Sequence, residues 1–175
     1  MRAPPRKILL TGAPGCGKTT AVVSIVAALD RSKTAGFYTQ EIREAGVRKG
    51  FRWTRLDGPD GILAHVNIKG PCRVGKYGVN VKDLDEEVVP ILDPDASEAG
   101  VFVIDEIGKM ECRSRKFIEA VRRLLDSDKG VLATIALKGS GLIEEVKKRP
   151  DVTLYHLTTN NREETKDEIL QLLCS

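Results

Sequence analysis

Residues 12–19 form the sequence Gly12-Ala13-Pro14-Gly15-Cys16-Gly17-Lys18-Thr19. This sequence fits the pattern G-x-x-x-x-G-K-[ST], whose glycines let the backbone turn tightly and bring its N–H groups close to phosphate oxygens. A short apolar strand is predicted at about 7–11 before it, and an apolar-striped helix at about 17–29 after it. Because a buried strand followed by a helix is the context in which this pattern binds anions, we predict a phosphate-binding loop.

The parts of this loop have separate expected roles. The Lys18 ammonium would reach the β- and γ-phosphates of a nucleotide, and the Thr19 hydroxyl would be a ligand of Mg²⁺. The N-terminus of the following helix adds unpaired N–H groups and the positive end of the helix dipole. We therefore expect residues 12–19, together with Thr20, to contact the nucleotide.

A second apolar run, residues 101–104, ends in two carboxylates, Asp105 and Glu106. The run is typical of a Walker B strand, in which the aspartate holds Mg²⁺ through water opposite Thr19. A carboxylate one position later can accept a proton from, or orient, a water molecule that attacks the γ-phosphate. An Asp-Glu pair can also start a solvated loop or cap a helix, but the loop upstream favours the functional interpretation. We predict Asp105 as a metal residue and Glu106 as the catalytic base, and we include Gly108 in the nucleotide site.

Thr134 is a polar residue in the otherwise apolar strand predicted at about 131–137. In P-loop ATPases of the additional-strand type, this strand lies between those that carry the P-loop and the Walker B acids. A hydroxyl group there could sense the γ-phosphate or orient water. Threonine is also a good strand former, so both interpretations stay open.

The order of predicted elements is mostly strand then helix, which indicates a three-layer α/β fold with a mostly parallel sheet. Two extended runs over about 35–56, with a turn at 44–46, predict an antiparallel hairpin that extends this sheet. Phe51 and Trp53 would share one face of the hairpin and pack into the core. Without an internal repeat or a long linker, residues 1–175 are expected to form a single domain.

The spacing of residues predicts one amphipathic helix and the first residues of two others. Residues 114–125 have the spacing of an amphipathic helix. Asp83 with Glu86, and Asn160 with Glu163, have the spacing of a capping residue and a carboxylate three positions later. We therefore expect Asp83 and Asn160 to cap helices.

Composition argues against several classes of protein. Lys and Arg number 28 and Asp and Glu 25, a net charge of +3, whereas nucleic-acid-binding proteins usually show a stronger or more concentrated basic excess. The four cysteines are far apart and lack the short spacing of zinc ligands. No apolar run approaches the length of a membrane span or a signal-peptide core. We expect a cytoplasmic protein without a membrane partner, with a nuclear location left open.

Further segments form a pattern that covers nearly the whole chain, and Asp105-Glu106-Ile107-Gly108-Lys109-Met110-Glu111 is its most specific part. The others are residues 36–43, 73–77, 133–135, 149–152 and 160–162. Together with the loop they resemble the THEP-type nucleoside-triphosphatases, also called the cancer-related nucleoside-triphosphatases. The resemblance implies a Mg²⁺-dependent hydrolase with a RecA-like fold, slow turnover and tolerance of the nucleobase, and it leaves the cellular role and any protein partner undefined.

The charge of a phosphoryl-transfer transition state requires a cation beyond Lys18. The candidates lie in or near the family-like segments: Arg43, Arg73, Lys109, Arg113 and Arg162. For each of them, a surface salt bridge is the competing interpretation.

Two other functions stay open. A nucleotide or small-molecule kinase would use the same loop, with residues 48–55 as an acceptor lid, although Glu106 argues against it. A nucleic-acid-binding switch controlled by a nucleoside triphosphate would use the same run, which mixes basic and aromatic residues. Packing of Phe51 and Trp53 into the core explains that mixture as well, so nucleic acid is an open but not a favoured partner.

Overall fold

The structure is a computed structural model and describes residues 6–175. Its strands are β1 (Lys7–Thr11), β2 (Thr34–Glu44), β3 (Val47–Arg55), β4 (Asp60–His65), β5 (Arg73–Val74), β6 (Tyr77–Val79), β7 (Val101–Ile107), β8 (Gly130–Ile135) and β9 (Val152–His156). Its α-helices are α1 (Lys18–Ala28), α2 (Val81–Asp83), α3 (Arg115–Asp126), α4 (Leu142–Lys147) and α5 (Arg162–Cys174). A π-helical turn at Leu84–Val88 and a 3₁₀ turn at Val89–Leu92 continue α2.

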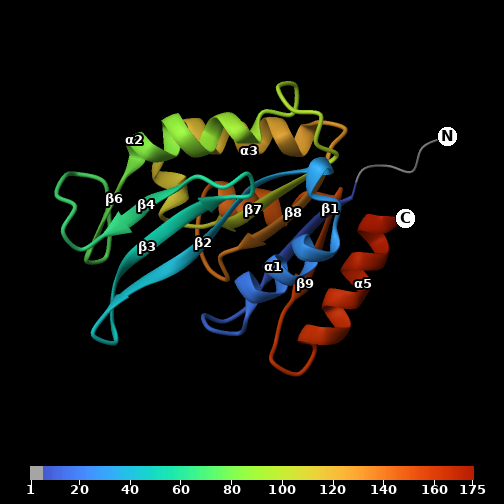
Figure 1. Ribbon diagram of the computed structural model, residues 1–175, viewed down its shortest axis with the longest axis horizontal. Coiled ribbons are helices and arrows are strands. Elements are labelled where there is room, and N and C mark those ends of the chain that lie inside the picture. Colours follow the sequence, from blue (N-terminus) through green and yellow to red (C-terminus); the bar gives the residue numbers. More distant parts are fainter. Residues whose placement is uncertain (1–5) are drawn as a thin grey trace.

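One sheet joins all these strands in the order β5-β6-β4-β3-β2-β7-β8-β1-β9 (Figure 1). The strands β2, β7, β8, β1 and β9 pair in parallel, as expected from the alternation of strands and helices. β8 lies between β7 and β1, which confirms the additional strand between the predicted Walker B strand and the P-loop strand. The carboxyl ends of β1, β7 and β8 therefore meet at one edge of the sheet.

Helices cover both faces of this parallel part (Figure 1). On one face, Val22 of α1 and Ile169 of α5 belong to the same buried cluster as Leu10 of β1. On the other face, Phe117 of α3 belongs to a cluster with Leu9 of β1. Because successive residues of β1 point to opposite faces and both faces are covered, all five of its residues are buried. The three-layer arrangement is confirmed.

The antiparallel extension is larger than the single hairpin expected from the sequence, since β3, β4, β6 and β5 all belong to it. Its first hairpin turns at Ala45 and Gly46, whose φ angles of 49° and 77° are both positive, as a tight two-residue hairpin turn requires. Trp53 is 2 % exposed, and Phe51 packs edge-on against Tyr77 with their ring centroids 5.4 Å apart. The predicted packing of both aromatic side chains into the core is confirmed.

The predicted helix caps at Asp83 and Asn160 are wrong. Asn80 caps α2, because its side chain accepts a hydrogen bond from the N–H of Asp83. α5 begins one residue later than the capping pair requires, after Asn161. Asn and Asp are favoured equally at helix starts, so the spacing alone did not distinguish neighbouring positions. Ser114 caps the predicted amphipathic helix as α3.

Among residues 6–175, no helix has both the length and the apolar character that crossing a membrane requires.

Candidate active site

The phosphate-binding loop connects β1 to α1 at the carboxyl edge of the parallel strands. Gly17, the residue before α1, has φ 96° and ψ 25°, a left-handed conformation that glycine adopts without steric cost. The Nζ atom of Lys18 donates a hydrogen bond to the carbonyl oxygen of Gly12 at 2.8 Å, so the ammonium group lies over the start of the loop. The other loop residues comprise buried Cys16, half-buried Thr19, and exposed Ala13, Pro14, Gly15 and Thr20.

Asp105 is a buried carboxylate near the end of β7, only 2 % exposed. Its Oδ1 atom accepts a hydrogen bond from Oγ1 of Thr134 in β8 at 2.6 Å, and its Oδ2 atom accepts one from the backbone N–H of Thr39 in β2 at 3.4 Å. Burial raises the pKa of Asp105, while hydrogen bonds from Thr134, Thr19 and Thr39 act in the opposite direction. Both neighbouring strands and the start of α1 therefore converge on this carboxylate.

Glu106 and Glu111 approach each other around Gly108. A methyl group at Gly108 would lie 2.6 Å from Oε1 of Glu106 and 2.8 Å from Oε2 of Glu111, so a side chain there would displace both carboxyl groups. Burial and the nearby Asp105 carboxylate raise the pKa of Glu106, and the charge of Lys18 opposes them. Glu111 is 3 % exposed, and burial, followed by the charge of Glu106, holds its pKa well above the usual range. The predicted base thus has a second, buried carboxyl group beside it.

Two of the candidate cations are engaged in the antiparallel extension. Nη2 of Arg43 forms an ion pair with Oε2 of Glu41 at 2.8 Å. Nη2 of Arg73 donates to the carbonyl oxygen of Lys76 at 2.8 Å, and Nη1 donates to the carbonyl oxygen of Ile68, in the connection between β4 and β5, at 3.0 Å. Six strands lie between β5 and β1, and the seven spacings of about 4.8 Å place β5, with Arg73, roughly 34 Å from β1. The contacts of Arg43 and Arg73 are made within the extension and not at the phosphate-binding loop.

The remaining candidates lie nearer the site. Lys109 and Arg113 are exposed residues just beyond β7. Arg162, the first residue of α5, lies against the phosphate-binding loop: a methyl group at Gly17 would be 2.7 Å from its Nη1 atom and 3.0 Å from its Cδ atom. Of the five candidates, it is the one whose contact with the loop is defined by distances.

Two contacts at the site were not predicted from the sequence. The bond from Thr39 to Asp105 uses a backbone N–H, which no side-chain pattern reveals. Glu111 belongs to the most specific family-like segment, but its burial against Glu106 depends on the turn at 108–111. Predicting that a carboxyl group in such a short polar segment is buried would require knowing the conformation of that turn.

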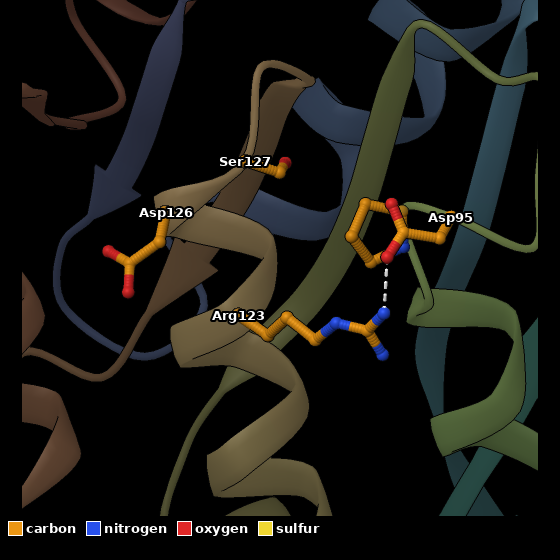
Figure 2. A pocket seen from close by; sticks show the side chains of 5 residues that line it. Asp95, Arg123, Asp126 and Ser127 are labelled. Carbon is orange, nitrogen blue, oxygen red and sulfur yellow. Dashed lines mark hydrogen bonds and ion pairs between the residues drawn. The ribbon is translucent and has the colours of Figure 1, made fainter.

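A surface hollow lies at the other end of the parallel strands, near their amino ends. It is lined by Asp95, Arg123, Asp126 and Ser127 together with Pro94. Figure 2 shows Arg123 of α3 reaching its ion-pair partner Asp95, while Asp126 points away from both. The segments that hold these residues lead into the amino ends of β7 and β8. Ligands of open α/β sheets bind at the carboxyl ends of the strands, so this hollow is not part of the candidate site.

The residues at the carboxyl edge suit Mg²⁺. This ion prefers hard oxygen ligands, and in nucleotide sites it is held by one or two protein groups together with phosphates and water. The Asp105 carboxylate and the Thr19 hydroxyl are such groups. A cation beside Asp105 would also offset the cost of burying its charge.

A sequence profile described as NTPase matches residues 7–170. The chain belongs to this nucleoside-triphosphatase family. It is 47% identical over 167 residues to the nucleoside-triphosphatase THEP1 of Thermotoga sp. (strain RQ2), covering 95% of both chains. The crystal structure of THEP1 from Aquifex aeolicus superimposes with a TM-score of 0.87 at 39% identity, covering 95% of this chain and 98% of that chain. The solution structure of a human cancer-related nucleoside triphosphatase gives a TM-score of 0.81 at 38% identity, covering 96% and 97%. The family resemblance and the fold class predicted from the sequence are confirmed.

Proposed function

We propose that this chain hydrolyses nucleoside 5′-triphosphates to the diphosphate and phosphate with Mg²⁺, slowly and without a strong preference for one base. Its family membership supports the nucleoside-triphosphatase activity. The observation that carries the proposal is the position of Glu106, which follows the buried Asp105 and is close enough to Lys18 for the ammonium charge to act on it. A carboxylate in that position can activate water beside the γ-phosphate.

Each group at the carboxyl edge has a role in this proposal. The backbone N–H groups of residues 12–19, with Thr20, surround the phosphates, and the Lys18 ammonium leaves the carbonyl of Gly12 to bind the β- and γ-oxygens. Thr19 and Asp105 would hold Mg²⁺, which when bound withdraws charge from the phosphate oxygens. Thr134 fixes the orientation of Asp105 through their 2.6 Å hydrogen bond.

Glu106 accepts the proton of the attacking water in this scheme. Its raised pKa makes the carboxylate a stronger base than an exposed glutamate. The positive charge of Lys18 acts in the opposite direction and favours the ionised form of Glu106. Gly108 leaves the space in which Glu106 lies beside Glu111. Gly108 therefore belongs to the site by providing space and not by a side-chain contact.

The positions of four of the five candidate cations support the proposal of slow turnover. Arg43 and Arg73 are engaged in the extension, and Lys109 and Arg113 are exposed to water, where a charge is screened. An arginine fixed at the transferring phosphoryl group is worth about three to five orders of magnitude in rate. Without one, Lys18 and the metal ion carry most of the charge stabilisation.

Phosphate release from ATP, GTP, CTP and UTP tests this proposal, measured with Mg²⁺, with EDTA, and with each nucleoside monophosphate added. We expect release from all four within about tenfold of each other, because every loop contact goes to groups that they share. EDTA should abolish release, and monophosphates should have no effect. Release that begins only when one monophosphate is added, with its diphosphate appearing, would instead identify a kinase.

A further inference from the structure

Arg162 is held beside the phosphate-binding loop by the segment that follows β9. The N–H of Leu157 donates to the carbonyl of Thr11 at 2.7 Å, and a methyl group at Gly12 would lie 2.5 Å from the carbonyl oxygen of Leu157. Five residues later, the Arg162 side chain lies over Gly17 at the other end of the loop. The segment 157–162 therefore follows the phosphate-binding loop along its whole length.

The side chain of Asn161 fixes the turn that carries Arg162. Its Oδ1 atom accepts a hydrogen bond from the N–H of Thr158 at 2.8 Å, and its Nδ2 atom donates to the carbonyl of His156 at 2.9 Å. Arg162 thus follows a turn whose backbone is held by hydrogen bonds to the side chain of Asn161. Preorganised groups of this kind lose little conformational entropy when a ligand binds.

Arg162 is a half-buried residue, and among residues 6–175 its guanidinium group forms no ion pair. The nearest acidic residue on its own helix, Glu163, pairs with Lys166. Arg162, Lys18 and the N-terminal end of the α1 dipole therefore concentrate positive charge at the loop, with no carboxylate bound to this guanidinium. An unpaired guanidinium beside a phosphate-binding loop is suited to an anionic ligand.

Arg162 lies on the opposite side of β1 from Asp105 and Glu106. β8 and β7, which carry Thr134 and Asp105, lie on one side of β1, and β9 with its connection to α5 lies on the other. In the proposed function the γ-phosphate is next to Asp105 and Glu106. The α-phosphate and the nucleoside must then extend away from these residues, towards the β9 side.

We propose that Arg162 binds the nucleoside end of the substrate, where its planar guanidinium contacts the α-phosphate and the adjoining nucleoside without distinguishing the base. This inference rests on the proposed function for the direction of the bound nucleotide. It makes Arg162 a substrate-binding residue and not a cation for the γ-phosphate in the transition state. A contact present in both the ground state and the transition state changes KM and leaves kcat unchanged.

The test is Arg162→Gln, with Lys166→Gln as the matched control, since Lys166 is one turn later on the same helix and loses the same charge. Dissociation constants for ADP and ATP are measured by calorimetry beside kcat and KM for the four triphosphates. We expect Arg162→Gln to weaken ADP and ATP by a similar factor on the order of 10- to 100-fold, the range for hydrogen bonds to a charged group. KM should rise by the same factor for all four bases, while kcat stays within about twofold.

Other outcomes overturn this assignment. A fall in kcat with unchanged affinity for ADP would place Arg162 at the γ-phosphate, and unchanged affinity and unchanged kcat would make it a surface residue. Arg162→Lys keeps the charge without the planar group, so it should recover only part of the lost affinity. An equal loss in Lys166→Gln would reveal a general charge effect. The ADP measurement needs no hydrolysis, so it stands even where phosphate release from the unmodified protein identifies a kinase.

Discussion

The parallel and antiparallel parts of the sheet differ in whether their charged side chains form ion pairs. In the extension, arginines on the strands find carboxylates: Arg43 and Arg48 with Glu41, Arg52 with Asp60, and Arg55 with Asp57. At the carboxyl edge of the parallel strands, Lys18, Glu106 and Arg162 form no ion pairs with other residues in the range 6–175. Lys18 binds a backbone carbonyl instead.

This difference indicates which charges serve the fold and which serve a ligand. Exposed ion pairs contribute little to stability, and the ion pairs of the extension are mostly of this exposed kind. A charged side chain that is buried without a partner lowers the stability of the fold, unless a ligand or a metal ion of opposite charge binds to it. If the comparison holds, changes at the carboxyl edge alter activity, and changes in the extension leave activity unchanged.

The largest effect is expected for Glu106→Gln. The amide has the size of the carboxyl group but cannot accept the proton of water, so kcat should fall by about 10²- to 10⁴-fold. Affinity for ATP should stay within a few-fold, because the loop contacts are intact. Equal losses of affinity and turnover would show that Glu106 acts in binding and not as the base.

The pH dependence of kcat/KM gives a second view of the same residue. The active form is the carboxylate, and burial with the neighbouring Asp105 charge raises the pKa of Glu106. Activity should therefore be lost, as the pH falls, at a higher pH than an exposed glutamate would produce. Glu106→Gln should remove this acid limb from the residual activity.

A smaller effect is expected for Thr134→Val, which keeps the shape of the side chain and removes the hydroxyl bound to Asp105. Groups that orient a metal ligand usually contribute 10- to 100-fold to metal affinity. The Mg²⁺ concentration for half-maximal activity should rise by about that factor, and Thr134→Ser should restore it. If Thr134→Val keeps the Mg²⁺ dependence of the unmodified protein, the hydroxyl group does not orient Asp105 and Thr134 serves only as a strand former.

The sequence was sufficient for those parts of the site that lie on regular elements. Local sequence patterns identify the loop, the apolar run before Asp105 and the strand around Thr134. Because the three strands are parallel, their carboxyl ends lie at the same end of the sheet. The contact of Arg162 with Gly17 depends on how the segment after β9 runs along the loop. The burial of Glu111 depends on a turn of four residues. Neither geometry has a sequence period, and neither was predicted from the residues.

The antiparallel extension was also predicted only in part from the sequence. Its first hairpin was predicted because the turn at Ala45 and Gly46 has a strong local signal. β4, β5 and β6 are separated by connections that each contain a glycine, and Trp53 and Tyr77 pack in the same buried cluster as Leu63 of β4 and Val79 of β6. Tertiary packing therefore determined how many strands join the edge.

The smallest effects on activity are expected for Arg43→Gln and Arg73→Gln, and they test the other half of the comparison. Both variants should keep kcat/KM within about twofold. Arg73→Gln should lower the free energy of unfolding by about 1 kcal/mol, because the backbone carbonyls of Ile68 and Lys76 lose a donor. Arg43→Gln removes an exposed ion pair and a hydrogen bond to the carbonyl of Gly46 that water can replace, so it should change stability by less than Arg73→Gln. Urea unfolding beside steady-state kinetics separates the two quantities. A tenfold loss of kcat at unchanged stability in either variant would mean that the extension closes over the nucleotide during turnover, and the division of charges between the two halves of the sheet would then fail.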